Sequence, residues 1–110
     1  FANYLRFMER GRTEWLRSRG IEQDALRSDH NLLFSLASTS AKFLRPARFD
    51  DSLTVRTRLE KLSGARVVFS QAVHRGDNSE ELLCAADCVV ACISADQFKP
   101  SRIPAGLLDV

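Results

Sequence analysis

The stretch FANYLRFMERGRTEWLRSRG, from Phe1 to Gly20, decides the fold of this chain. Within it, Tyr4, Met8 and Trp15 recur at spacings of four and seven residues, which places them on one face of an α-helix. Most of its charged residues fall on the other side. The pattern predicts one long amphipathic helix over Asn3 to Arg19, and Gly20 suits the position just past its end.

Two positions in this helix carry further information. Asn3 is placed to cap the first turn, because its side-chain oxygen can accept an otherwise unpaired N–H. Gly11 lies in the middle of the apolar face. It is either a tolerated helix glycine, at a cost of about 1 kcal/mol, or a point of close approach to a sheet.

Downstream of the helix, four stretches have the composition or the alternation of β-strands. They are Leu32 to Leu44, Ser52 to Leu62, Arg66 to His74 and Glu81 to Ser94. A linker with local helix over Ile21 to Asn31 precedes them, and Ser63-Gly64-Ala65 suits a hairpin turn. The last strand is apolar on both faces apart from Asp87, so we expect cover on both sides. One helix followed by an antiparallel meander predicts an α+β fold.

Length and composition limit the classes of protein. The 110 residues are 45% hydrophobic and 27% charged, which predicts one globular domain over residues 1–110. A net charge of +2 argues against a nucleic-acid partner, because such proteins usually carry a stronger basic surplus. The sequence has no run of 18 apolar residues, so we expect no membrane span.

Three cysteines, Cys84, Cys88 and Cys92, lie at intervals of four residues. On a strand, each pair would be about 13 Å apart, at about 3.3 Å per residue. That is too far for one metal ion or one disulfide. We expect small buried thiols in a reducing compartment, which favours a cytoplasmic protein without a metal.

Sequence motifs alone identify few candidate functional residues, because the sequence matches no nucleotide-binding loop, zinc-binding framework or catalytic triad. His30 and His74 are predicted to be surface histidines, and Asp87 is predicted to be a paired or edge-facing carboxylate. The chain has 13 Arg and 3 Lys, and the arginine fork suits phosphate groups. Arg66, close after Gly64, is on pattern either a phosphate contact or a solvated hairpin arginine.

Longer motifs are more specific. The stretch Ala2 to Arg17 resembles the helix of the hotdog-fold acyl-CoA thioesterases of the 4-hydroxybenzoyl-CoA thioesterase superfamily, and looks closest to the bacterial Tol-Pal-associated, YbgC-type branch. Three further agreements follow along the chain: PARFDD at Pro46 to Asp51, Phe69-Ser70-Gln71, and Lys99-Pro100 with Ile103-Pro104. The resemblance covers essentially the whole chain.

The resemblance implies a hotdog fold, in which a curled antiparallel sheet of about five strands wraps a long helix. The sequence supplies four strand-like stretches, and in the family the remaining strand precedes the helix. That strand also carries the catalytic Asp of the family. We therefore expect both to lie before Phe1, which is not a start residue.

By the same resemblance, the backbone N–H of Phe1 polarises the thioester carbonyl, since helix N-termini favour a developing oxyanion. Many relatives have His there; Phe cannot do acid–base chemistry, so it would act through its main chain and line the acyl pocket. Asn3 and Tyr4 match the motif beside this position and are candidates for substrate binding. A purely structural role, capping and seating the helix, is the interpretation we prefer for both.

The phosphates of CoA bind in this family near the hairpin that matches Ser63, Gly64 and Arg66. The resemblance therefore favours ligand contact for Arg66. Gly64 permits close backbone approach, and the Ser63 hydroxyl can donate a hydrogen bond.

The implied function is hydrolysis of an acyl-CoA thioester to CoA and a free acid, with the upstream Asp as nucleophile or general base and without a cofactor. A homo-oligomer, either dimer or tetramer, is expected, and acyl carrier protein is a further candidate partner. Three alternatives stay open: a hotdog dehydratase, which would need a His in the site; a non-catalytic module that binds acyl-CoA or acyl carrier protein; and an interaction protein of the cell envelope.

Overall fold

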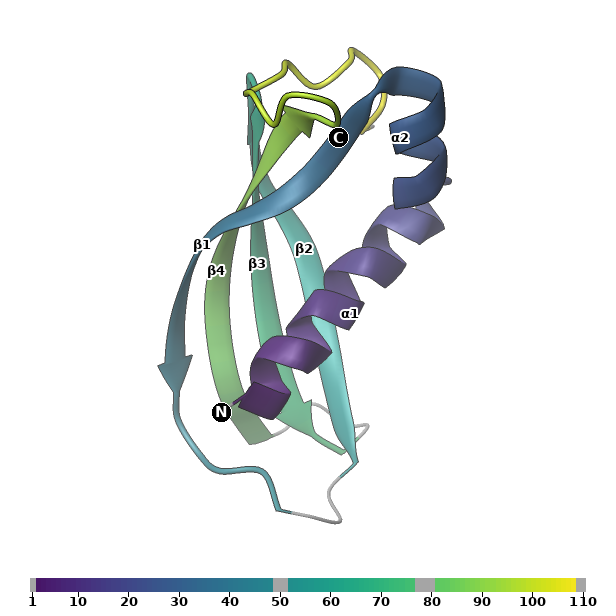
Figure 1. Ribbon diagram of the computed structural model, residues 1–110. Helices are drawn as coiled ribbons and strands as arrows, with labels where there is room; N and C mark the ends of the chain where they lie inside the picture. The colour runs from purple at the N-terminus through teal and green to yellow at the C-terminus, as the bar shows by residue number, and fades with distance from the viewer. Residues whose placement is uncertain (1, 49–51, 77–80, 109–110) are drawn as a thin grey trace.

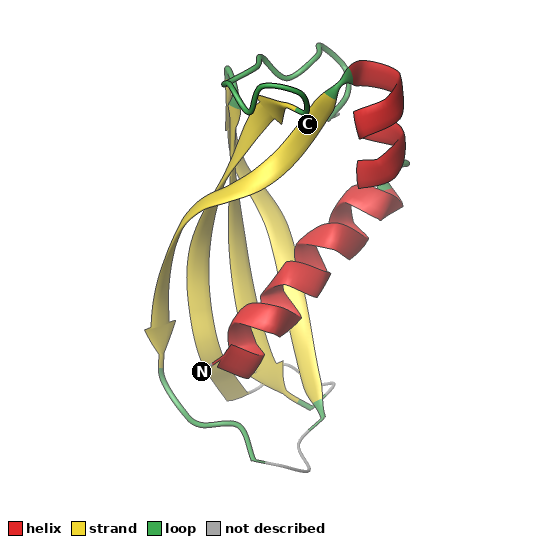
Figure 2. Cartoon of the chain, in the orientation of Figure 1, coloured by secondary structure: helices red, strands yellow, loops and turns green. Residues whose placement is uncertain are grey.

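The structure is a computed structural model, and it describes residues 2–48, 52–76 and 81–108. Two helices, α1 (Ala2–Ser18) and α2 (Gln23–His30), precede four strands: β1 (Leu32–Phe43), β2 (Leu53–Ser63), β3 (Arg66–Arg75) and β4 (Glu81–Ser94). The strands form one antiparallel sheet in the order β1-β4-β3-β2. Figures 1 and 2 show the sheet curling around α1, which crosses one face of it. The predicted α+β class is confirmed, and β2, β3 and β4 pair in sequence as a meander does. The prediction of a meander through all four strands is wrong, because β1 pairs with β4 and the chain crosses from there to β2 at the opposite edge of the sheet.

The buried face of α1 is the one that its spacing predicts. Tyr4, Met8 and Leu16 are buried, and Met8 has no exposed surface. Trp15 packs edge-on against Phe69 of β3, with ring centroids 5.3 Å apart. The helix is therefore fixed to the sheet along its whole length by apolar contact.

Gly11 marks the closest approach of α1 to the sheet. A Cβ at this position would lie 2.9 Å from Thr57 Oγ1 and 2.9 Å from Val55 Cγ1, both on β2. Ordinary carbon contacts are longer than this. Of the two explanations offered by the sequence, close approach to the sheet is therefore correct.

The helical part of the linker is α2, which packs against β1. Asn31 ends it in the left-handed conformation, at φ 56°, and donates its backbone N–H to Arg27 O at 3.0 Å. Asn is among the few residues other than glycine that adopt this conformation readily. This single residue turns the chain directly from α2 into β1.

One face of the sheet forms the core with α1. On β3, alternate residues Val67, Phe69, Gln71 and Val73 are buried, as the alternation predicts. On β4, the three cysteines are buried and free, which agrees with their predicted strand spacing. The other face of β4 is only half-buried and its Asp87 is exposed, so cover on both sides is not found within the described residues of a single chain.

None of the described helices is long and apolar enough to span a membrane. Beyond β4 the chain turns back at Ser94 and runs beside the end of that strand. Ser94 N donates to Lys99 O at 2.8 Å, and Ser101 N donates to Cys92 O at 2.9 Å. Further along, Ile103 N reaches Gly64 O at 3.1 Å, so this tail lies next to the β2–β3 hairpin.

Candidate active site

The start of α1 is the first candidate region. The first described residue of α1 is Ala2, and its first turn carries no acidic side chain. Backbone N–H groups in the first turn of a helix have no partner within the helix and carry partial positive charge. Phe1 lies outside the described residues, and for Asn3 only the helical backbone is described, so the roles of these two residues stay predictions.

Tyr4 anchors this helix start to the end of β1. Its side chain is 3% exposed, its hydroxyl donates to Arg45 O at 2.6 Å, and its ring stacks on Phe43 with centroids 6.0 Å apart. The phenol is therefore engaged within the chain. The geometry gives Tyr4 the seating role that the sequence offered as one of two explanations, and substrate contact stays a prediction.

The second candidate region is the β2–β3 hairpin. Gly64 has φ +59°, where L-residues are strained, and open space surrounds it. Ser63 pairs with Arg66 across the turn, and both are exposed. The three predicted residues Ser63, Gly64 and Arg66 thus form one accessible turn.

These two regions lie at opposite ends of the sheet. Tyr4 stacks on Phe43, which pairs with Cys84, whereas Arg66 pairs with Ala91. The seven residues between these positions on β4 span about 23 Å at about 3.3 Å per residue. Figure 1 shows α1 starting at one end of the sheet and the turn between β2 and β3 at the other. Among the described residues, a single chain therefore does not bring Tyr4 and the start of α1 together with Ser63, Gly64 and Arg66.

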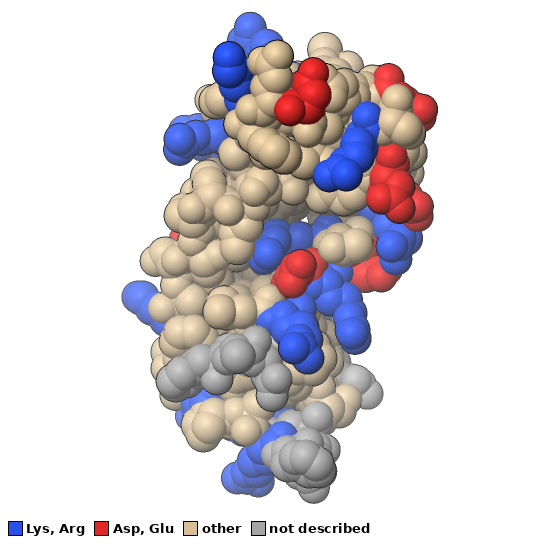
Figure 3. All heavy atoms as spheres, viewed as in Figure 1, with Lys and Arg blue, Asp and Glu red and all other residues tan. Residues whose placement is uncertain are grey.

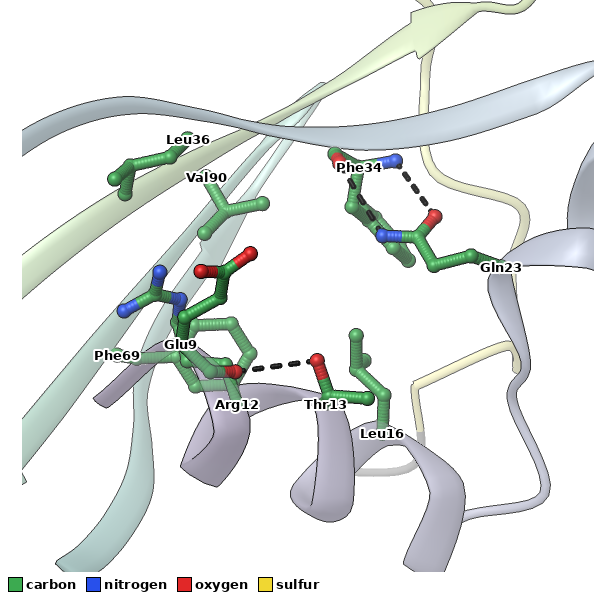
Figure 4. A pocket seen from close by; sticks show the side chains of 9 residues that line it. All are labelled: Glu9, Arg12, Thr13, Leu16, Gln23, Phe34, Leu36, Phe69 and Val90. Carbon is green, nitrogen blue, oxygen red and sulfur yellow. Dashed lines mark hydrogen bonds between the residues drawn. The ribbon is translucent and has the colours of Figure 1, made fainter. Parts of the chain in front are cut away.

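A groove between α1 and β1 runs along the helix. It consists of two cavities, of about 120 Å³ and about 430 Å³, which share Glu9, Arg12 and Leu36. Figure 4 shows Glu9 and Arg12 projecting from α1 on the side of Leu36 and Val90. Leu5 lines the larger cavity near the start of the helix. The groove therefore leads from the first turns of α1 into the molecule.

Arg12, which lines this groove, belongs to a polar cluster between α1 and the sheet. Arg12 Nη1 donates to Gln71 Oε1 at 2.8 Å and lies 3.3 Å from Cys88 Sγ. Gln71 Nε2 donates to Met8 O at 2.8 Å and to Thr57 Oγ1 at 2.9 Å. Gln71 is only 2% exposed, so its amide links helix backbone, β2 and the guanidinium in a nearly dry environment.

The sequence indicated only half of this cluster. Strand alternation places Gln71 on the apolar face, where a buried amide must find partners. Helical periodicity instead groups Arg12 with the solvated charges of α1, and so misses that its guanidinium turns inward. The position of Gln71 among apolar neighbours was therefore the signal that the opposing helix had to supply a polar partner.

Burial determines the state of two of the thiols. It raises the pKa of Cys92, and it raises the pKa of Cys84 together with a smaller effect of the neighbouring Cys88. A raised pKa keeps a thiol protonated, and a protonated thiol is a poor nucleophile. Within the described chain, no three His, Cys, Asp or Glu residues are placed to hold a metal ion.

Comparison with known sequences decides the family. The sequence profile of the thioesterase superfamily matches residues 1–82. The chain belongs to this superfamily. The acyl-CoA thioester hydrolase YbgC of Escherichia coli O6:H1 is 32% identical over 107 residues, which covers 97% of this chain and 78% of that protein. The resemblance read from the α1 motif is thereby confirmed.

Solved structures of thioesterases have the same fold. A probable thioesterase from Bartonella henselae superposes with a TM-score of 0.85 at 38% identity, over 94% of this chain and 82% of that one. A variant of 4-hydroxybenzoyl CoA thioesterase, crystallised with 4-hydroxybenzoyl CoA, superposes with a TM-score of 0.89 over 97% of this chain and 81% of that one. At 19% identity the latter shows the fold alone. The chain therefore has the predicted hotdog fold of this superfamily.

Proposed function

We propose that this thioesterase-superfamily protein hydrolyses acyl-CoA thioesters to CoA and a free carboxylic acid. The observation that carries the proposal is the 32% identity, across nearly the whole chain, to the acyl-CoA thioester hydrolase YbgC. The free buried thiols of β4 suit a reducing compartment, so we place the protein in the cytoplasm.

The proposed chemistry uses the start of α1. The backbone N–H of Phe1 donates to the thioester carbonyl oxygen, and the helix dipole favours the negative charge that forms there. An Asp before Phe1 acts as general base for the attacking water, or as a nucleophile that forms an acyl-Asp anhydride, which water then hydrolyses to the free acid and the regenerated Asp. In both routes the C–S bond breaks, and the CoA sulfur leaves as a thiolate that takes up a proton. Tyr4 positions this helix start through its bond to Arg45 O.

The proposed site is completed by a second copy of the chain. The β1 strand is one of the two edge strands of the described sheet, and among the described residues Gln23 covers its edge at Phe34 alone, with two hydrogen bonds of 3.3 Å. An uncovered edge is a template for pairing with another strand. Leu36, Phe43 and Leu44, on or beside β1, are 49%, 39% and 52% exposed. These features support an antiparallel β1–β1 contact between two copies, in a dimer or a tetramer.

Such a contact would bring the two candidate regions, which are far apart in one chain, together between two chains. Because antiparallel strands run in opposite directions, the hairpin end of one chain lies beside the α1 start of the other. The partner subunit's Arg66 would then serve the site at the start of α1. We also propose acyl carrier protein as an alternative to CoA as the carrier of the acyl group.

The test is thiol release from a panel of acyl-CoAs by the full-length protein. The panel contains short aliphatic, long aliphatic and benzoyl-type esters. We expect turnover of at least one ester, abolished when the Asp before Phe1 is replaced by Asn. Folded protein that binds CoA esters but releases no thiol would contradict hydrolysis and identify a binding module.

A further inference from the structure

Three charged side chains meet where the chain leaves β1 and where β4 begins. Glu81, the first residue of β4, accepts a hydrogen bond from Arg45 Nη1 on Oε1 at 3.2 Å, and its Oε2 lies 3.3 Å from Arg75 Nε. Arg75, the last residue of β3, also donates from Nη2 to Pro46 O at 3.1 Å. Since Pro46 follows Arg45 in the chain, these contacts close a ring, which we call the clamp: Arg45, Pro46, Arg75 and Glu81.

The clamp holds the stretch of backbone that carries the acceptor of Tyr4. The Tyr4 hydroxyl donates to Arg45 O at 2.6 Å, and the Tyr4 ring is buried and stacks on Phe43. A residue before proline is restricted to extended backbone, so Pro46 limits the directions that the Arg45 carbonyl can take. Leu83 O accepts from Arg45 N at 3.2 Å and fixes the other side of the same residue. The clamp therefore restrains a carbonyl that already has little freedom.

The charge of Glu81 keeps the clamp closed, because this carboxylate lies between two guanidinium groups. Without it, Arg45 and Arg75 would repel each other, and the segment that they hold would move. Figure 3 shows Lys and Arg side chains at this end of the molecule. Both ion pairs are partly exposed, and isolated pairs of this kind contribute little to stability. A closed ring instead fixes geometry, because Glu81 and Arg75 each hold two members at once.

This geometry bears on the start of α1. Tyr4 lies in the first turn, two residues or about 3 Å after Ala2, since a helix rises about 1.5 Å per residue. Figure 1 shows the start of α1, the end of β1 and the start of β4 at the same end of the molecule. Misplacement of a reacting group by about 1 Å can lower a rate about a hundredfold. A shift of the Arg45 carbonyl would therefore be transmitted through Tyr4 to the helix start that the proposed chemistry uses.

We propose that Glu81 and Arg75 are positioning residues for the hydrolysis. Through Arg45 and Tyr4 they hold the start of α1 where its backbone N–H groups meet the thioester carbonyl. This inference rests on the proposed function. Opening the clamp should lower kcat more than it changes KM, because the carbonyl oxygen carries its full negative charge only near the transition state.

The decisive variants are Glu81→Gln, Tyr4→Phe and their combination in the full-length protein. Glu81→Gln removes the charge and keeps the shape of the side chain, whereas Tyr4→Phe removes only the hydroxyl. We expect each to lower kcat about tenfold, with KM within about twofold. The double variant should lose less than about twofold beyond either single variant, because both changes break the same path. Glu22→Gln is the matched control, since it breaks a 3.2 Å ion pair with Arg17 beyond the other end of α1 and should leave the kinetics unchanged.

Amide hydrogen exchange separates this inference from the hydrolysis itself. In Glu81→Gln, the amides of Arg6, Phe7 and Met8 should exchange about fivefold faster or more, whereas those of the last turn of α1 should not change. Faster exchange there, in a protein that turns over no acyl-CoA, would contradict the proposed function and support the clamp. Unchanged exchange at these three amides, or equally faster exchange throughout the protein, would overturn the clamp. Losses of kcat that multiply in the double variant would also overturn it, because they would show that Glu81 and Tyr4 act independently.

Discussion

At the scale of single residues, Gln71 holds together three parts of the molecule. Its amide accepts from Arg12 and donates to Met8 O and to Thr57, in a position that is 2% exposed. A buried polar group without a hydrogen-bond partner lowers stability by its full desolvation free energy, whereas a hydrogen-bonded one changes stability little. The cluster therefore specifies how α1 sits on the sheet.

We expect Gln71→Leu to destabilise the protein, because it leaves polar groups without their hydrogen-bond partners. The Arg12 guanidinium loses its oxygen acceptor and Thr57 loses a donor, so we expect a loss of about 2–3 kcal/mol in the free energy of unfolding. Urea unfolding followed by tryptophan fluorescence measures it. The control is Gln97→Leu, since Gln97 is exposed and should change stability by less than about 0.5 kcal/mol. Equal effects at both positions would remove Gln71 from this role.

The buried thiols predict a pH dependence of stability. Burial raises the pKa of Cys84 and Cys92 above the ordinary 9.0, so the folded state holds these protons more tightly than the unfolded state does. Their contribution is fully present below pH 9 and is lost as the pH rises through the folded-state values. We expect the urea midpoint to fall above pH 9 in the parent protein and to fall less in Cys92→Ala. An identical decline in both proteins would contradict the assignment.

At the scale of elements, the contact of α1 with β2 depends on the missing side chain of Gly11. Alanine gains helix propensity of up to about 1 kcal/mol, but its Cβ would meet Val55 and Thr57 at 2.9 Å. Overpacking of this kind typically costs about 1–3 kcal/mol, so we expect Gly11→Ala to destabilise the protein. Thermal unfolding tests this. Val55→Ala should be less harmful in the Gly11→Ala background than alone, because it opens space for the new methyl group.

The elements themselves could be read from the sequence to within two residues. Apolar residues at a spacing of four predicted α1, and Ser63-Gly64-Ala65 predicted the turn between β2 and β3. The inward turn of Arg12 was not readable, because periodicity assigns a long polar side chain to the solvent and cannot show what its end contacts.

At the scale of the whole molecule, the open edge of β1 predicts assembly. Leu36 is 49% exposed on this strand and lies beyond the segment that Gln23 covers. A charge there should oppose edge pairing, because it would be desolvated between two sheets. We expect Leu36→Lys to shift the protein from oligomer to monomer in sedimentation velocity, with a parallel loss of thioesterase activity. Leu62→Lys places the same charge at another exposed leucine, on β2, and should leave the oligomeric state unchanged.

The placement of the two candidate regions at opposite ends of the sheet has a genetic consequence. If each site takes its α1 start from one chain and its β2–β3 hairpin from the other, two inactive variants can complement each other. One variant would be damaged before Phe1, and the other would be damaged at Ser63 and Arg66 together. Random reassociation after mixing would restore about a quarter of the parental sites, because half of the dimers are mixed and each mixed dimer has one intact site. Co-expression should therefore rescue activity that neither allele provides, whereas sites built within single chains would give no rescue.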